Sequence, residues 1–298
     1  MAVFPGNPAR EGQCLSLGPA GFHTLAYVEW GQREAMRTII CAHGLTRNAR
    51  DFDWLAASLG KIENWRIICP DVVGRGRSDH LAPTAIHAYN YPQYLFDAAT
   101  LLAHLNARYV DWIGTSMGGL IGMFLAAYPG TPIQRLVLND VGPFIPKQAI
   151  ERIQRYIGDA NQSFLSIEAV EKYLRQIYAP FGELTDAQWR HMAIHSARET
   201  SKGYILAYDP NIGTALGATQ IQDVDLWSVW EQINCPILLI HGVKSDLLLS
   251  QTVREMLARG PGAKGLVEVL EVREAGHAPA LRNDEQINAI QNWLLKSN

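Results

Sequence analysis

The chain has 298 residues, of which 48% are hydrophobic, and its formal net charge is −3. This length suits one large α/β domain or a core with an inserted subdomain, and the apolar share is ample for a buried core. The absence of a basic block argues against nucleic acid as a partner, and no apolar run approaches the roughly 20 residues of a membrane helix. Residues 1–8 show no secretory signal, so a cytoplasmic location is expected.

Short runs rich in Ile, Val and Leu alternate with helical patterns along most of the chain. The expected strands cover residues 23–30, 37–41, 65–69, 109–113, 133–138, 236–240 and 266–272. The expected helices cover residues 51–59, 94–107, 116–127, 250–259 and 284–296. Continuous apolar strands between helices predict an α/β fold, in which a mostly parallel sheet is flanked by helices. Loops at the carboxyl ends of such strands meet along one edge, where ligands bind.

This alternation stops in the middle of the chain. From about Pro143 to Gln222 the pattern shows helical segments and no convincing strand, and Thr185 to Gln188 forms a capping box that opens a helix. We therefore expect an α/β core made of residues 1–142 and 223–298, with an all-helical cap at residues 143–222. The insertion is rich in aromatic residues, some of which would line an apolar pocket.

A candidate nucleophile follows one of the expected strands. The sequence Gly114-Thr115-Ser116-Met117-Gly118 lies between an apolar run and a helical segment. Small residues on both sides allow a tight strand-to-helix turn, which exposes the serine hydroxyl beside a helix N-terminus.

A serine hydroxyl needs a base, and a histidine base needs a carboxylate that orients it. His277 is the candidate base, in a loop between the last expected strand and the last helix. Asp246 is the favoured carboxylate because it follows the strand at 236–240 and gives the chain order Ser, Asp, His. Asp140, which directly ends the strand at 133–138, is the rival.

The loop after the strand at 37–41 reads His43-Gly44-Leu45-Thr46-Arg47. A developing oxyanion needs two backbone donors, which we assign to the amides of Leu45 and Met117. We expect His43, Gly44 and Arg47 to contact the substrate, and Arg47 could pair with a substrate carboxylate. A structural ion pair is the alternative role for Arg47.

Taken in order, these motifs resemble the signature of the α/β-hydrolase superfamily. The resemblance spans nearly the whole chain and rests on His43-Gly44, the run from Asp71 to Ser78 (DVVGRGRS), the serine motif, Asp246, and Gly276-His277. It implies that the insertion is that family's helical cap. It also implies that the Asp71 to Ser78 run is a structural turn.

The resemblance implies a serine hydrolase without a cofactor or metal, acting on a small carboxylic ester or lactone. A hydrolase of C–C bonds in ring-cleavage diketone acids is the alternative, and a ligand receptor with the same fold is a further one. The sequence identifies neither the substrate nor the oligomeric state, and a homodimer stays open.

Two further groups of residues have simpler interpretations. His191 and His195 are four residues apart on a cap helix, but the motif lacks the glutamate of a zinc helix, so an exposed helix face is expected. The four cysteines have no paired spacing, and Cys41, Cys69 and Cys235 lie in or beside apolar runs. Buried free thiols are expected.

Overall fold

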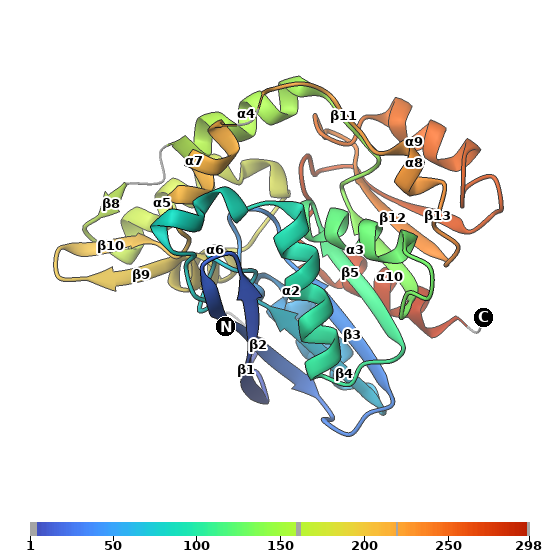
Figure 1. Cartoon of the computed structure of the whole chain (residues 1–298), viewed down its shortest axis with the longest axis horizontal. Helices are drawn as coiled ribbons and strands as arrows, with labels where there is room; N and C mark the ends of the chain where they lie inside the picture. Colours follow the sequence, from blue (N-terminus) through green and yellow to red (C-terminus); the bar gives the residue numbers. More distant parts are fainter. Residues whose placement is uncertain (1–4, 159–161, 219, 297–298) are drawn as a thin grey trace.

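An eight-stranded sheet forms the centre of the molecule (Figure 1), in a computed structural model that describes residues 5–158, 162–218 and 220–296. The strand order is β1-β2-β4-β3-β5-β6-β12-β13. β1 pairs antiparallel with β2, and β2 with β4, whereas every neighbouring pair from β4 to β13 is parallel. The bounds are β1 Arg10–Gly18, β2 Gly21–Gly31, β3 Arg37–Ala42, β4 Trp65–Pro70, β5 Val110–Thr115, β6 Ile133–Asn139, β12 Ile237–Gly242 and β13 Val267–Val272.

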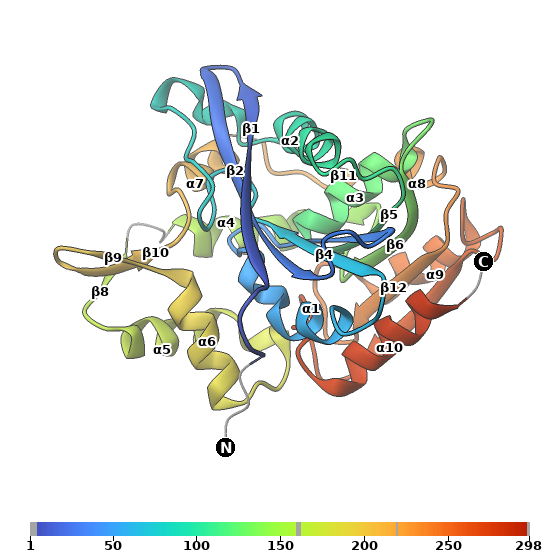
Figure 2. The ribbon, with the colours of Figure 1, turned by 90° about the horizontal axis from the view of Figure 1, so that it is seen from below.

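Helices cover both faces of this sheet. Figure 2 shows α1 and α10 on one face and α2, α3 and α8 on the other. The bounds are η1 Ala49–Phe52, α1 Asp53–Leu59, η2 Pro83–Ala88, α2 Tyr91–His104, α3 Met117–Ala127, α8 Trp227–Trp230, α9 Ser250–Ala258 and α10 Asp284–Leu295. The mostly parallel sheet flanked by helices, predicted from the sequence, is confirmed.

The apolar runs form these strands because both of their faces are covered. Every residue of β12 is buried, as is every residue of β3 except the first. Alternate residues of β3 contribute to different hydrophobic clusters: Ile40 belongs to the one beneath α2 and α3, and Ile39 to the one beneath α1 and α10. All four cysteines are free and buried, which confirms that expectation.

Strand β1 was not predicted. Its buried positions are Cys14 and Ser16, whereas Leu15 and Leu17 are exposed and the first half of the strand is polar or glycine. Such a strand shows little hydrophobic alternation, so its pairing with β2 has no clear signal in the sequence.

The inserted segment lies over one edge of the core (Figure 1). Its helices are α4 Lys147–Gly158, α5 Ile167–Ile177, η3 Ala179–Phe181, α6 Asp186–Ser196 and α7 Asn211–Gly217. The capping box at the start of α6 is confirmed, with Thr185 and Gln188 each accepting from the other's backbone amide. No helix in the described part of the chain has both the length and the apolar character needed to cross a membrane.

The expectation that this segment is all-helical was wrong. A three-stranded antiparallel sheet joins β8 (Ser163–Phe164), β10 (Gly203–Leu206) and β9 (Ala197–Thr200). A second pairing joins β7 (Phe144–Ile145) to β11 (Val224–Asp225). Strands of two to four residues are too short to show a period-2 pattern, which explains why the sequence did not reveal them.

Helix α3 lies unusually close to the sheet at its first turn. A Cβ atom on Gly118 would lie 2.1 Å from the carbonyl oxygen of Ala42 at the end of β3. The Gly118 carbonyl accepts a hydrogen bond of 2.9 Å from the indole of Trp112 on β5. This contact fixes the start of α3 against β3 and β5, so the position tolerates no side chain.

We predict that Gly118→Ala lowers the free energy of unfolding by about 2 kcal/mol or more, because the added methyl group must displace backbone. Chemical denaturation of the purified variant measures this loss. Gly217→Ala on α7 is the matched control, since a Cβ there meets no atom within 4 Å. Equal stability of the two variants would show that α3 can move away from β3 without cost.

Candidate active site

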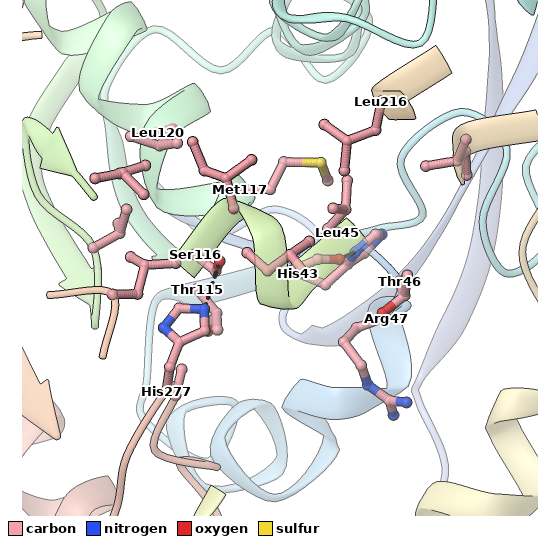
Figure 3. Close-up of a pocket in the computed structure, with 18 of the residues that line it drawn as sticks. His43, Leu45, Thr46, Arg47, Thr115, Ser116, Met117, Leu120, Leu216 and His277 are labelled. Atoms are coloured by element: carbon pink, nitrogen blue, oxygen red, sulfur yellow. Dashed lines mark hydrogen bonds between the residues drawn. The ribbon is translucent and has the colours of Figure 1, made fainter. Parts of the chain in front are cut away.

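Ser116 lies at the junction between β5 and α3, as the glycine-flanked motif predicts. Its backbone has φ 51° and ψ −116°, a strained conformation for a residue with a side chain. The Ser116 amide donates to the carbonyl of Asn139 at the end of β6 (3.0 Å), which anchors this turn. Figure 3 shows the Ser116 hydroxyl directed toward the ring of His277.

His277 connects the serine to a buried carboxylate. Its Nε2 lies 2.9 Å from Ser116 Oγ, and its Nδ1 lies 2.8 Å from Oδ2 of Asp140. The Asp140 side chain is fully buried, and that of His277 is 11% exposed. The structure therefore aligns a hydroxyl, an imidazole and a carboxylate along one hydrogen-bonded line.

The carboxylate in this line is Asp140, so the choice of Asp246 is corrected. The Asp246 side chain is 52% exposed and accepts both Nε and Nη2 of Arg152 on α4. Asp246 lies four residues beyond the end of β12, whereas Asp140 follows β6 directly. The residue of that loop that does contact Asp140 is Ser245, whose Oγ donates to Oδ2 (2.6 Å).

Asp140 is also fixed from its other side. The amide of Gly242 donates to Oδ1 (2.8 Å), and the backbone of Asp140 itself has φ 54°. The neighbouring Asn139 side chain donates to Thr115 Oγ1 (3.0 Å) and to the carbonyl of Pro279 (2.8 Å). The end of β6 thus ties the serine turn to the histidine loop.

The inserted segment holds the histidine loop as well. The amide of Gly276 donates to the carbonyl of Pro180 (2.7 Å), and the amide of Ala280 donates to that of Phe181 (3.2 Å). Both acceptors belong to η3, so backbone hydrogen bonds join η3 to the loop on either side of His277.

The loop after β3 lies against the serine. A Cβ on Gly44 would be 3.7 Å from Cβ of Ser116 and 3.8 Å from Cγ of Arg47, so this glycine separates the two side chains. Among the described residues, the amides of Leu45 and Met117 have no hydrogen-bond acceptor. Both residues line the same cavity as Ser116, where two free donors suit a developing oxyanion.

His43 holds this loop in place from beneath. It is fully buried, and its Nε2 accepts the amide hydrogen of Val72 (3.0 Å), so Nδ1 carries the proton that is donated to the Gly44 carbonyl (2.7 Å). Burial lowers the pKa of His43 from 6.5 to about 4, which keeps the ring neutral at pH 7. Its contacts are with the backbone, so the expected substrate contact becomes a positioning role.

A cavity of about 450 Å³ opens in front of Ser116, between the core and the inserted segment. This volume suits a small molecule. The insertion contributes mostly apolar and aromatic side chains, including Ile153, Tyr156, Tyr178 and Phe181.

Two of the arginines in the wall, Arg47 and Arg282, share one carboxylate. Arg47 donates Nε and Nη2 to Asp51 (2.8 and 2.6 Å), and its guanidinium lies 4.8 Å from the ring centre of Tyr178. Arg282 donates Nη2 to the same carboxylate (3.1 Å). Arg282 was not predicted from the sequence. It lies 231 positions after Asp51 in the chain, and only the fold brings the two side chains together.

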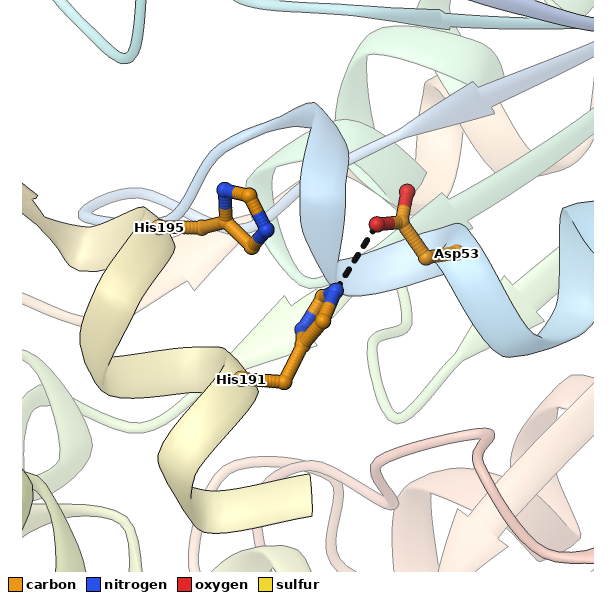
Figure 4. A group of neighbouring side chains, drawn as sticks. All are labelled: Asp53, His191 and His195. Atoms are coloured by element: carbon orange, nitrogen blue, oxygen red, sulfur yellow. Dashed lines mark hydrogen bonds and ion pairs between the residues drawn. The ribbon is translucent and has the colours of Figure 1, made fainter. Parts of the chain in front are cut away.

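His191 and His195 do not form an exposed helix face, so that expectation was wrong. His191 is buried, and its Nε2 lies 2.9 Å from Asp53 Oδ2 (Figure 4). Arg50 donates to the same oxygen (2.7 Å) and lies 3.5 Å from His195 Nδ1. Because the positively charged Arg50 contacts both Asp53 and His195, this group is poorly suited to bind a metal cation. It serves instead as a polar contact between α6 and α1.

Comparison with known proteins agrees with this architecture. The model of the alpha/beta hydrolase family matches residues 39–290. The chain belongs to the alpha/beta hydrolase family. It is 44% identical over 284 residues to a 3-hydroxybutyrate-oligomer hydrolase from Cupriavidus necator, which covers 92% of this chain and 93% of that protein.

Solved structures support the same assignment. A protein from Rickettsia typhi superposes with a TM-score of 0.85 at 36% identity, covering 97% of this chain and 99% of the other. An alpha/beta hydrolase from Novosphingobium aromaticivorans has a TM-score of 0.82 at 34% identity, with coverage of 97% and 99%. Membership in this family and the similarity to a known hydrolase show that the protein is an enzyme of the hydrolase class.

The buried ring of His43 predicts a specific loss of stability in acid. Between pH 6.5 and about 4, the unfolded chain binds a proton at this histidine and the folded protein does not, so stability falls as pH is lowered through this window. Asp71, whose pKa burial raises to about 6, acts in the opposite direction. Comparison with a variant therefore isolates the His43 contribution.

We expect His43→Gln to be less stable than the wild type at pH 7, because the bonds to Gly44 and Val72 are weakened. Its stability should also fall less steeply between pH 6.5 and 4. Urea denaturation at several pH values measures both effects. If the difference in free energy of unfolding between the two proteins stayed constant with pH, His43 would bind its proton equally well in the folded and the unfolded chain.

Proposed function

We propose that this hydrolase cleaves a carboxylic ester or lactone through an acyl-enzyme on Ser116. The observation that carries the proposal is the hydrogen-bonded line from Ser116 through His277 to Asp140, which faces an apolar cavity. The Cupriavidus necator relative, whose name gives 3-hydroxybutyrate oligomers as its substrate, supports a short aliphatic ester.

In the proposed first step, Ser116 Oγ attacks the ester carbonyl carbon while His277 Nε2 takes the hydroxyl proton. Asp140 accepts the hydrogen bond from Nδ1, which orients the ring and stabilises the imidazolium. The amides of Leu45 and Met117 donate to the oxyanion. The proton on Nε2 then passes to the departing alcohol, and the acyl group remains on Ser116.

The second step returns the enzyme to its starting state. A water molecule loses a proton to His277 and attacks the acyl carbon. Collapse of this second tetrahedral species breaks the bond to Oγ, which recovers the proton from His277 and releases the acid. No group outside the protein and water is needed for this balance.

We predict that Ser116→Ala reduces turnover of a short-chain aryl ester by more than about a thousandfold, because the nucleophile is lost. A fluorophosphonate should label the wild type at Ser116 and leave the variant unlabelled, as read by mass spectrometry. Retained ester hydrolysis in the variant would reject the mechanism. Cleavage of a vinylogous diketone acid without cleavage of any ester would move the assignment to a C–C hydrolase.

The two candidate acids can be separated by mutation. Asp140→Asn should lower kcat at least about a hundredfold, because the ring of His277 loses the acceptor for its Nδ1 proton. Asp246→Asn should change kcat by less than about threefold, since it removes only a half-exposed ion pair with Arg152. Thermal unfolding of both variants controls for misfolding. The reverse order of effects would restore Asp246 as the acid.

A further inference from the structure

The cluster of Arg47, Arg282 and Asp51 in the cavity wall carries one more positive than negative charge. Arg47 and Arg282 share the single carboxylate of Asp51, and all three residues line the cavity. The arginine side chains are only 5% and 2% exposed, and that of Asp51 is 18% exposed. Two guanidinium groups are thus withdrawn from water with one counter-charge between them.

The surrounding groups do not cancel this excess. Arg50 and Asp53, on the far side of the cluster, form their own ion pair. Burial lowers the pKa values of His191 and His195, the latter to about 3, so both rings are neutral at pH 7. Arg152, the other arginine of the cavity wall, is already paired with Asp246.

An uncompensated buried charge is costly, and an anion in the cavity would remove that cost. Burial and the neighbouring Arg47 lower the pKa of Arg282 to about 10 despite the opposing effect of Asp51. Despite burial, Asp51 and Tyr178 raise the pKa of Arg47 above its usual value, so Arg282 is the member of the pair that lacks sufficient negative charge nearby. Guanidinium groups bind carboxylates particularly well, because their paired N–H donors match the two oxygens.

The position of the cluster relates the anion to the scissile bond. Arg47 is two residues beyond Leu45, whose amide is a proposed oxyanion donor, and Gly44 lies between the side chains of Arg47 and Ser116. Figure 3 shows Arg47 on the loop that leads away from Ser116 and His277. A group bound at Arg47 would therefore share the cavity with the reacting carbonyl, on the other side of Gly44.

We propose that Arg47 and Arg282 form a carboxylate-binding subsite, so that the preferred substrates are aliphatic esters with a free carboxylate close to the ester bond. This inference rests on the proposed ester hydrolysis and adds the substrate class. The apolar remainder of the cavity holds the aliphatic part, and Asp51 fixes the geometry of the arginines.

The test compares two substrates that differ in one charge. The linear dimer of 3-hydroxybutyrate carries a carboxylate three bonds from the ester oxygen, and its terminal carboxamide is a neutral analogue of similar shape. Release of the terminal unit is measured by chromatography. We expect the wild-type kcat/KM to be at least about tenfold higher for the acid than for the amide.

Variants then assign this preference to the cluster. Arg282→Met should reduce the preference about tenfold by raising KM for the acid, with little change for the amide. Arg47→Lys should retain part of it, and Asp51→Asn should preserve or increase it because a competing anion is removed. Arg152→Gln is the matched control, since that arginine is already neutralised, and it should leave the preference unchanged.

The outcomes separate this inference from the proposed function. Hydrolysis of both substrates with equal kcat/KM by the wild type would overturn the subsite and leave the esterase proposal intact. If Arg282→Met lowered kcat/KM equally for both substrates and unfolded like the wild type, the cluster would have a structural role only and would not bind a carboxylate. Failure to cleave either substrate or any aryl ester would instead contradict the proposed function.

Discussion

The buried carboxylate of Asp140 holds three segments together that are remote in the chain. Its oxygens accept from the Gly242 amide, the Ser245 hydroxyl and the ring of His277. A buried carboxylate requires such donors, and they are in reach only because β12 pairs with β6, with Ile240 opposite Asn139. The order of the strands is therefore a condition for the proposed active site, and the ring of His277 is positioned by the same contacts that complete the sheet.

The parts of this fold that the sequence predicted are those with a local cause. Strands such as β3 and β12 are covered on both faces, so each appears as a continuous apolar run. The turn at Ser116 was visible because its close approach to β3 demands glycine at position 118. The start of α6 was visible because a capping box is complete within four residues.

The parts that the sequence did not predict depend on tertiary contacts. Asp140 and Asp246 both follow strands, and chain order alone does not distinguish them; the distinction arises from which one β12 and the histidine loop enclose. Arg282 had no local signal for its place beside Asp51. The short strands of the insertion are stabilised by one another, so their residues show no pattern of their own.

The hydrogen bonds from Gly276 to Pro180 and from Ala280 to Phe181 join the inserted segment to the backbone that carries the ring of His277. Separation of η3 from the core would break both bonds and free that backbone, which would disturb the alignment of the ring with the hydroxyl. The position of η3 and the alignment of the proposed proton-transfer path therefore depend on each other. A substitution that weakens the contact of η3 with this loop would thus act on the proposed base from outside the line of Ser116, His277 and Asp140.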